Sequence, residues 1–398
     1  MNIEIEKIRS YRLHAHHLDM KSPITSLEST AGACGLQNSP PGAWETALWN
    51  RLDDCSLQTL HDALYQQKLL LQTWSYRGVP VVFPTSQSDV FLSPLIAQMG
   101  EQPWIYTRGI TAALDFMQMK FDDLLPMVKE ATKYLNNHTV KSKEALDRTL
   151  AEIVETHLPQ EKRPLWRAPS MYGAPDRQTV GGAVVSFLLR PCSFSSLVVF
   201  GERQGVSPTF TSFQNWIGHV PDKLPEVEKM LMRKFLHCYG PTTMADFMNW
   251  LGCSTQQAKR LWSCIANELE PVQVEGKTRF MLSPDIQELF SAGTCEENWR
   301  LLGAHDPYLD MKDRTVLLEN KSLHKLVWKT VANPGVIIKR GCIEGIWAIK
   351  TVKDRLNISM TTWETISSQD RQKLESLAEG YAAFRLLSLQ KCTIGSIS

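Results

Sequence analysis

The sequence predicts an α+β protein of tandem winged-helix domains, each a helix-turn-helix with a β-hairpin wing, followed by a C-terminal β-rich region. Three observations support this fold class. The chain has 398 residues, too many for one ordinary core, which indicates two to four domains. Its hydrophobic content of 43% and charged content of 21% are typical of globular proteins. A group of helices followed by a strand pair recurs along the chain, as in a winged helix.

Composition excludes several classes of protein. The apolar runs, such as residues 181–189, are far shorter than a membrane span, and the acidic N-terminus has no apolar core. We therefore expect no signal peptide and a cytoplasmic location. Nine scattered cysteines include no Cys-x-x-Cys pair, which argues against a zinc site and a disulfide framework. The net charge of +1 still permits a local basic face.

The first predicted domain, residues 1–104, begins with a histidine-rich helix. The run His14-Ala15-His16-His17 has no carboxylate or cysteine cluster beside it in the sequence, so we expect a solvated helix end and not a metal site. Later in the domain, residues 56–64 predict a capped helix, and residues 69–74 and 78–84 predict a strand pair.

The segment 35–42, Gly-Leu-Gln-Asn-Ser-Pro-Pro-Gly, joins a run of small residues to an apolar helix in this domain. Its two prolines favour a helix start and stiffen the residues before them. The side chains of Gln37 and Ser39 are two residues apart on this segment, so we expect them to point the same way. The alternative is an ordinary loop whose polar groups cap the helix.

The second and third predicted domains, 105–220 and 221–284, repeat the pattern. The expected elements are helices at 109–134, 140–157 and 179–189 with a hairpin around 197–211, then helices at 226–239, 243–252 and 255–269 with a hairpin at 272–281. On position alone, the recognition helix of the third domain carries Gln256, Gln257, Lys259 and Arg260. A packing module with a solvated polar face is the alternative, since many winged helices bind no DNA.

The C-terminal region, residues 285–398, carries much of the positive charge. Between residues 300 and 355 there are 11 Lys and Arg against 6 Asp and Glu. Residues 336–347 predict a strand hairpin with Lys339 and Arg340 at its tip, which is suited to reach DNA phosphates, although a solvated turn would look the same. A helix over 370–387 is expected to follow as the last element.

Several stretches together resemble the AlkZ-like winged-helix DNA glycosylases, a family that includes the YcaQ-type crosslink-repair enzymes. The resemblance runs from about residue 25 to 355. It rests on the Gln37 segment leading into Trp74-Ser75-Tyr76-Arg77-Gly78-Val79-Pro80, on 239–247 with Trp250-Leu251-Gly252, and on 301–309 continuing through Asp313-Arg314 and Asn333-Pro334-Gly335-Val336.

This resemblance implies tandem winged helices curved around duplex DNA and enzymes that release alkylated purines, some of which unhook interstrand crosslinks. The family's catalytic feature is a Gln-x-Gln or Gln-x-Asp motif in the first domain. Gln37 matches the first position, and Ser39 departs from both versions of the second, which bears on activity or substrate range. Asn38 falls on the variable middle position.

The resemblance also implies a partner, double-stranded DNA containing alkylated bases, and a monofunctional DNA glycosylase without cofactor or metal. We expect DNA-phosphate contacts at Arg77, Arg203, Lys339 and Arg340. We expect a monomer, because no segment predicts a dimerisation coiled coil. We expect no membrane association, because the apolar runs are too short to span a membrane.

A glutamine amide is chemically suited to assist cleavage of the bond between an alkylated purine and its sugar. Alkylation at N7 or N3 makes a purine cationic and therefore a good leaving group. The enzyme then needs to hold a water near C1′ and stabilise an oxocarbenium-like sugar, which an amide dipole achieves without acting as an ordinary base. Ser39 is able to hold the same water through its hydroxyl.

Two other functions are compatible with the sequence. The first is a non-catalytic DNA-binding regulator on the same scaffold, and the second is a winged-helix interaction module without DNA binding. The Asp306-Pro307-Tyr308 and Asp313-Arg314 segments are interpreted as structural, with turns and local ion pairs.

Overall fold

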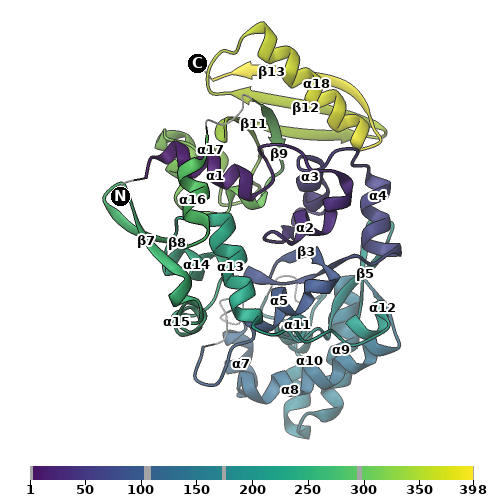
Figure 1. Ribbon diagram of the computed structural model, residues 1–398. Helices are drawn as coiled ribbons and strands as arrows, with labels where there is room; N and C mark the ends of the chain where they lie inside the picture. Colours follow the sequence, from purple (N-terminus) through teal and green to yellow (C-terminus); the bar gives the residue numbers. More distant parts are fainter. Residues whose placement is uncertain (1–2, 103–108, 173–175, 294–297, 398) are drawn as a thin grey trace. The chain divides into compact units, whose positions relative to one another are not determined.

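The computed structural model describes residues 3–102, 109–172, 176–293 and 298–397 and combines helices with small sheets (Figure 1). This confirms the α+β class. The chain forms two compact units, each made of separate stretches of sequence. The first unit comprises Met1–Ala63, Met232–Asp246 and Ile265–Ser398, and the second comprises Leu64–Leu231 and Phe247–Cys264. The division into four sequential domains stays a prediction.

The first unit contains the N-terminal helices and the C-terminal sheet. Its helices are α1 (Ile5–Ala15), α2 (Leu27–Gly32), α3 (Ala43–Trp49), α4 (Leu57–His61), α16 (Asp285–Ser291), α17 (His324–Val327), α18 (Ser368–Phe384) and most of α13 (Val227–Tyr239). Its strands are β1 (Leu36–Gln37), β7 (Leu269–Val274), β8 (Lys277–Leu282), β9 (Trp299–Leu302), β10 (Gly335–Lys339), β11 (Cys342–Val352), β12 (Arg355–Thr362) and β13 (Ser388–Ser396).

Five of these strands form one sheet in the order β13-β12-β11-β10-β9. All pairs are antiparallel except β12 and β13, which are parallel. The prediction that a helix would be the last element is therefore wrong, because β13 follows α18. The apolar residues of β13 are few, and its strand state comes from pairing with β12, where Ile358 lies opposite Cys392 and Met360 opposite Ile394.

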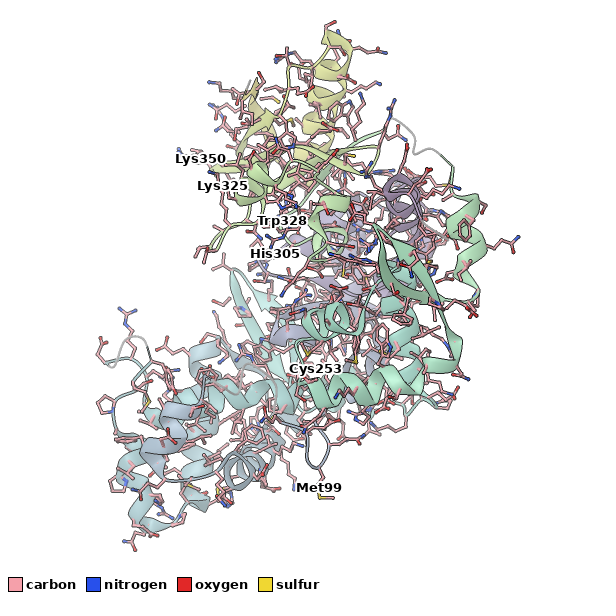
Figure 2. The ribbon with its side chains drawn as sticks, turned by 90° about the vertical axis from the view of Figure 1, so that its left-hand side faces the viewer. Met99, Cys253, His305, Lys325, Trp328 and Lys350 are labelled. Atoms are coloured by element: carbon pink, nitrogen blue, oxygen red, sulfur yellow. The ribbon has the colours of Figure 1, made fainter. Side chains whose placement is uncertain are left out.

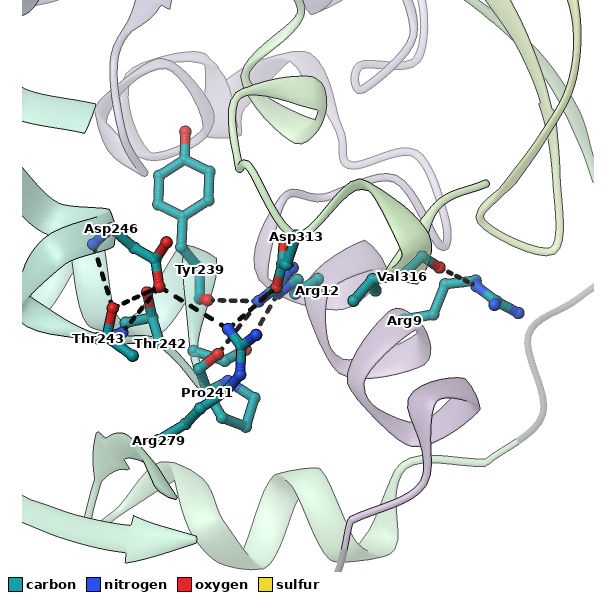
Figure 3. A network of polar contacts seen from close by, with 11 residues as sticks. Arg9, Arg12, Tyr239, Pro241, Thr242, Thr243, Asp246, Arg279, Asp313 and Val316 are labelled. Carbon is teal, nitrogen blue, oxygen red and sulfur yellow. Dashed lines mark hydrogen bonds and ion pairs between the residues drawn. The ribbon is translucent and has the colours of Figure 1, made fainter. Parts of the chain in front are cut away.

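Buried ion pairs connect distant segments of the first unit. The Arg12 Nη2 atom lies 2.8 Å from Asp313 Oδ2, and the same guanidinium donates to the carbonyl oxygens of Tyr239, Gly240 and Pro241 (Figure 3). Asp313 was expected to pair locally with Arg314, but its partners are Arg12 and Arg279. These partners are remote in sequence, so no local pattern could reveal them.

A second buried pair joins Arg51, just after α3, to Asp306. Two hydrogen bonds of 2.7 and 2.8 Å connect them, and their side chains are only 2% and 1% exposed. Asp306 also accepts a hydrogen bond from the backbone N–H of Tyr308, whose hydroxyl donates to the carbonyl of Gly341. This geometry confirms the structural interpretation of the Asp306-Pro307-Tyr308 segment.

The second unit is mainly helical around its own core. Its helices are α5 (Ser88–Leu92), α7 (Thr111–Met117), α8 (Phe121–Ala131), α9 (Lys143–His157), α10 (Arg163–Arg167), α11 (Val180–Phe194), α12 (Phe213–Ile217), α15 (Thr255–Cys264) and most of α14 (Met244–Leu251). Its strands are β2 (Leu70–Trp74), β3 (Pro80–Pro84), β4 (Val140–Lys141), β5 (Val199–Gln204) and β6 (Ser207–Thr211). Among the described helices of the chain, none has the length and apolarity to cross a membrane.

The hairpins predicted as wings are present as antiparallel pairs: β2 with β3, β5 with β6, and β7 with β8. Part of the polar face of α15, the expected recognition helix, makes contacts inside the second unit. Gln257 is 1% exposed and donates to the carbonyl of Pro94, while Arg260 pairs with Glu101 and Glu228. These two side chains therefore stabilise the second unit.

Replacing Asp306 by Asn is expected to lower the free energy of unfolding by about 3–5 kcal/mol, because Arg51 stays buried without a charged partner. Urea unfolding followed by tryptophan fluorescence measures the change. The matched control is Glu130→Gln, which breaks the exposed pair with Lys133 and should cost less than about 1 kcal/mol. Similar losses in the two variants would contradict a dominant role for the buried pair.

Candidate active site

The segment 37–42 runs from the last residue of β1 to the start of α3 and forms a tight loop that is held by its own polar groups. The Gln37 side chain is 7% exposed, and its Nε2 donates to the carbonyl of Ser39 at 3.1 Å. The Asn38 Oδ1 accepts a hydrogen bond of 2.7 Å from the backbone N–H of Gly42. Asn38 therefore closes the loop, and the bond to Ser39 fixes the orientation of the Gln37 amide.

Gly42 allows this loop to enter α3. Its φ angle is +90°, in the left-handed region that side chains with a Cβ rarely adopt. A Cβ added there would lie 3.1 Å from the Glu45 Oε2 atom. The helix therefore begins at Ala43, two residues after the prolines that were expected to start it.

The buried carboxylate of Glu45 lies close to the loop. Glu45, in the first turn of α3, accepts a hydrogen bond of 2.9 Å from His61 Nε2 and one of 2.5 Å from Arg385 Nη1. Burial by itself would raise the pKa of Glu45, but the hydrogen bond from His61 and the charge of Arg385 outweigh that effect. The pKa of Glu45 therefore lies below its ordinary value, and the group is an anion at neutral pH.

A pocket of about 260 Å³ opens beside this loop within the first unit. Pro40 to Ala43 form one wall, Gly303 and Ala304 a second, and residues 333–335 a third. These three segments belong to stretches on which the family resemblance rests. The pocket therefore brings together parts of the sequence that are more than 250 residues apart.

The remaining lining of the pocket is aromatic and basic. Trp347 and Tyr381 contribute rings whose centroids are 5.0 Å apart in an edge-to-face arrangement, and Arg385 adds a positive charge. The Tyr381 hydroxyl is 3.1 Å from the Thr46 Oγ1 atom, and Trp347 Nε1 donates to the carbonyl of Leu302 at 2.8 Å. Both rings are thereby fixed in orientation, which favours a preorganised binding surface.

The predicted phosphate-binding residues fall into both units. Lys339 and Arg340 are at the β10–β11 turn of the first unit; Lys339 lies 3.3 Å from Asp370 and over the Trp299 ring, while Arg340 is exposed. Arg340 and Gly341 have φ angles of 51° and 73°, the combination of a type I′ hairpin turn.

Arg77 and Arg203 belong to the second unit. Arg77 donates to the carbonyl of Trp250 and lies over the ring of Tyr76, whereas Arg203 is exposed on the β5–β6 hairpin.

Comparison with known proteins agrees with this arrangement. Residues 30–384 match the family model described as DNA glycosylase AlkZ-like. The chain belongs to the AlkZ-like DNA glycosylase family. It is 27% identical over 366 residues, or 88% of this chain and 89% of the relative, to an interstrand DNA cross-link repair glycosylase of Streptomyces sahachiroi. The solved structure of S. sahachiroi DNA glycosylase AlkZ has a similar fold, with a TM-score of 0.73 and 21% identity over 98% of this chain and 100% of that chain.

In this AlkZ-like chain, the sequence did not single out Arg385, which lines the pocket, or several exposed residues of the first unit. Arg385 is a single arginine at the end of α18, and no sequence signal distinguishes it from a solvated residue. Figure 2 shows the exposed Lys325 and Lys350 on the side of the first unit that also carries Trp328 and His305. The charge count over residues 300–355 included both lysines, but the sequence could not show that they lie on the same side of the first unit.

The Glu45 carboxylate should make stability depend on pH. Its depressed pKa means that its contribution is present above the ordinary value of 4.5 and is lost as the pH falls through the folded-state pKa. Glu45→Gln should therefore be less stable than wild type at pH 7, and the gap should narrow toward pH 4. Urea midpoints at both values measure this. A gap that does not change with pH would contradict the assignment, and Glu130→Gln provides the exposed control.

Proposed function

We propose that this chain is a monofunctional DNA repair glycosylase that hydrolyses the N-glycosidic bond of alkylated, cationic N7- or N3-substituted purines. Gln37 positions the attacking water, and Ser39 assists. Substrates include interstrand crosslinks in this proposal, by analogy with the cross-link repair glycosylase that the chain resembles. The observation that carries the proposal is the convergence of three family stretches on one pocket beside the Gln37 loop.

The hydrogen bonding of the loop fixes the Gln37 amide, and the loop residues that line the pocket are Pro40 to Gly42, not Gln37 or Ser39. The amide nitrogen is engaged by the Ser39 carbonyl, so the oxygen is the atom directed away from that carbonyl. An amide oxygen accepts a hydrogen bond from water and aligns it for attack at C1′, and its dipole stabilises positive charge on the sugar. Because the alkylated base is already cationic, its departure requires no general acid.

Ser39 is the main departure from the family motif. A hydroxyl oxygen orients a water but supplies a smaller dipole than an amide or a carboxylate. The Glu45 carboxylate lies one turn into α3, but its charge is paired with that of Arg385, which itself lines the pocket. The pair therefore supplies no net negative charge that would compensate for Ser39.

DNA is held, in this proposal, by winged-helix elements and by basic side chains of both units. Arg77, Arg203, Lys339 and Arg340 remain the predicted phosphate contacts, and Lys325 and Lys350 extend this set on the first unit. Trp347 and Tyr381 are only 4% and 3% exposed, so they shape the pocket wall and offer no free ring face for base stacking.

The decisive experiment is the release of 7-methylguanine from methylated duplex DNA under single-turnover conditions. Gln37→Ala should slow release on the order of 10²- to 10³-fold, because it removes the water-positioning group, while DNA affinity stays unchanged. Gln58→Ala is the matched control, since Gln58 is an exposed glutamine on α4 of the same unit. Equal rates for wild type and Gln37→Ala would contradict the proposed role of Gln37.

A non-catalytic DNA-binding protein is the second candidate, and the serine at position 39 favours it. It predicts DNA binding without base release from either methylated or crosslinked duplexes. A footprint confined to one palindromic sequence would select a regulator.

Phosphate contacts should make DNA binding depend on salt. Lys350→Ala should weaken binding to all duplex sequences alike and reduce the slope of log affinity against log salt by about 1. Fluorescence anisotropy across a salt series measures this slope. Lys133→Ala, which removes a lysine paired with Glu130, is the control and should leave the slope unchanged. Salt-independent affinity of the wild type would contradict phosphate binding altogether.

A further inference from the structure

A cluster of one histidine and two cysteines lies in the interior of the first unit. His16 is the residue after α1, Cys34 lies between α2 and β1, and Cys238 is near the end of α13. Their exposures are 2%, 3% and 0%. The sequence predicted a solvated end for the histidine-rich helix, and this is wrong for His16, although His14 is exposed.

The distances within the cluster approach those of a metal-ligand set. One ligand atom from each residue lies within 4.8 Å of the other two, and Cys34 Sγ is 3.9 Å from His16 Nδ1. In a tetrahedral zinc site, bond lengths of about 2.3 Å to sulfur and about 2.0 Å to nitrogen place neighbouring ligand atoms about 3.5–3.8 Å apart. A metal ion therefore fits among these three atoms with small side-chain adjustments.

The polar atoms of the cluster have few hydrogen-bond partners outside it. Among the described residues, the buried His16 Nε2 atom has no hydrogen-bond partner. The thiols of Cys34 and Cys238 face the carbonyls of Gly35 and Ala15 at 3.7 Å, and a thiol is only a weak donor. The Cys34 thiol is nearest the other ring nitrogen of His16, so Nδ1 is the atom that would face an ion in this cluster.

We propose that His16, Cys34 and Cys238 bind one thiophilic metal ion, Zn²⁺ or Cu⁺. Two thiolates and an imidazole are ligands that both ions prefer over hard cations such as Mg²⁺ or Ca²⁺. Binding displaces the two thiol protons to solvent, so the metal replaces the S–H hydrogens within the cluster.

Such a site has a structural role and is independent of the proposed glycosylase activity. It ties α1 and α13 to Cys34, which is three residues before Gln37. The ligands come from three separate stretches of the chain and assemble only on folding. The Cys-x-x-Cys criterion does not detect sites of this kind, because their spacing in sequence follows no motif.

The test uses untagged full-length protein produced with Zn²⁺ in the medium, and a parallel anaerobic sample reconstituted with Cu⁺. Native mass spectrometry and elemental analysis should find one metal ion per chain, and the arm that retains metal through dialysis identifies the ion. Co²⁺ substitution should give the near-ultraviolet charge-transfer band of thiolate ligation. These readouts need no variant, so they remain decisive if a variant fails to fold.

Matched variants locate the metal. His16→Ala and Cys238→Ala should lose it, whereas His14→Ala, on the exposed histidine of the same helix, and Cys192→Ala, on a buried cysteine of the second unit, should retain it. Failure of both samples to retain metal would overturn the proposal, as would a Cys34–Cys238 disulfide found by alkylation mapping. Metal that survives in His16→Ala and Cys238→Ala would place it elsewhere and would also overturn it.

Discussion

The buried ion pair between Arg51 and Asp306 is the interaction on which the arrangement of the first unit depends. The Arg51 guanidinium bonds to Asp306, to the carbonyl of Ala47 in α3 and to the carbonyl of His16. One side chain therefore connects the end of α1, the helix that follows the Gln37 loop, and the motif segment that borders the pocket. Desolvating these charges is expensive, and the geometry offsets that cost only because nearly all the donors of Arg51 are used.

The candidate site follows from this constraint. With α3 fixed at its C-terminal end by Arg51, its N-terminal end presents the Gln37 loop, closed by Asn38 and turned by Gly42. The side-chain hydrogen bonds that hold the loop, from Gln37 to Ser39 and from Gly42 to Asn38, are formed within the loop itself. Preorganisation of this kind is what water positioning requires, since misplacement by even 1 Å costs a large part of the rate.

Much of the local structure could be predicted from the sequence. The hairpins β2–β3, β5–β6 and β7–β8 and the cap of α4 by Ser56 depend on neighbouring residues, so pattern and turn chemistry are sufficient. The strand β13 and the partner of Asp313 could not be predicted, because both depend on contacts between distant segments. Local sequence patterns carry no information about such pairing.

The candidate site likewise combines features that follow from local sequence with features that depend on tertiary packing. Gln37 was identified through a family motif, and from its residues alone the loop was more readily interpreted as a helix cap. In the structure Asn38 closes the loop through the backbone N–H of Gly42, and α3 has no side-chain cap. Arg385 and the buried face of His16 gave no sequence signal, since a lone arginine and a histidine run are ordinary at helix ends. Their environments are created by tertiary packing, here through Glu45 for Arg385 and through Cys34 for His16.

The most direct test of the account is a crystal structure of the protein bound to duplex DNA that carries a cationic abasic-sugar analogue. The analogue mimics the charge of the oxocarbenium-like sugar. The account predicts that the sugar lies against the Gln37–Gly42 loop, with the Gln37 amide oxygen within hydrogen-bond distance of a water facing the C1′ position. A sugar bound on another surface, with no contact to this loop, would contradict it.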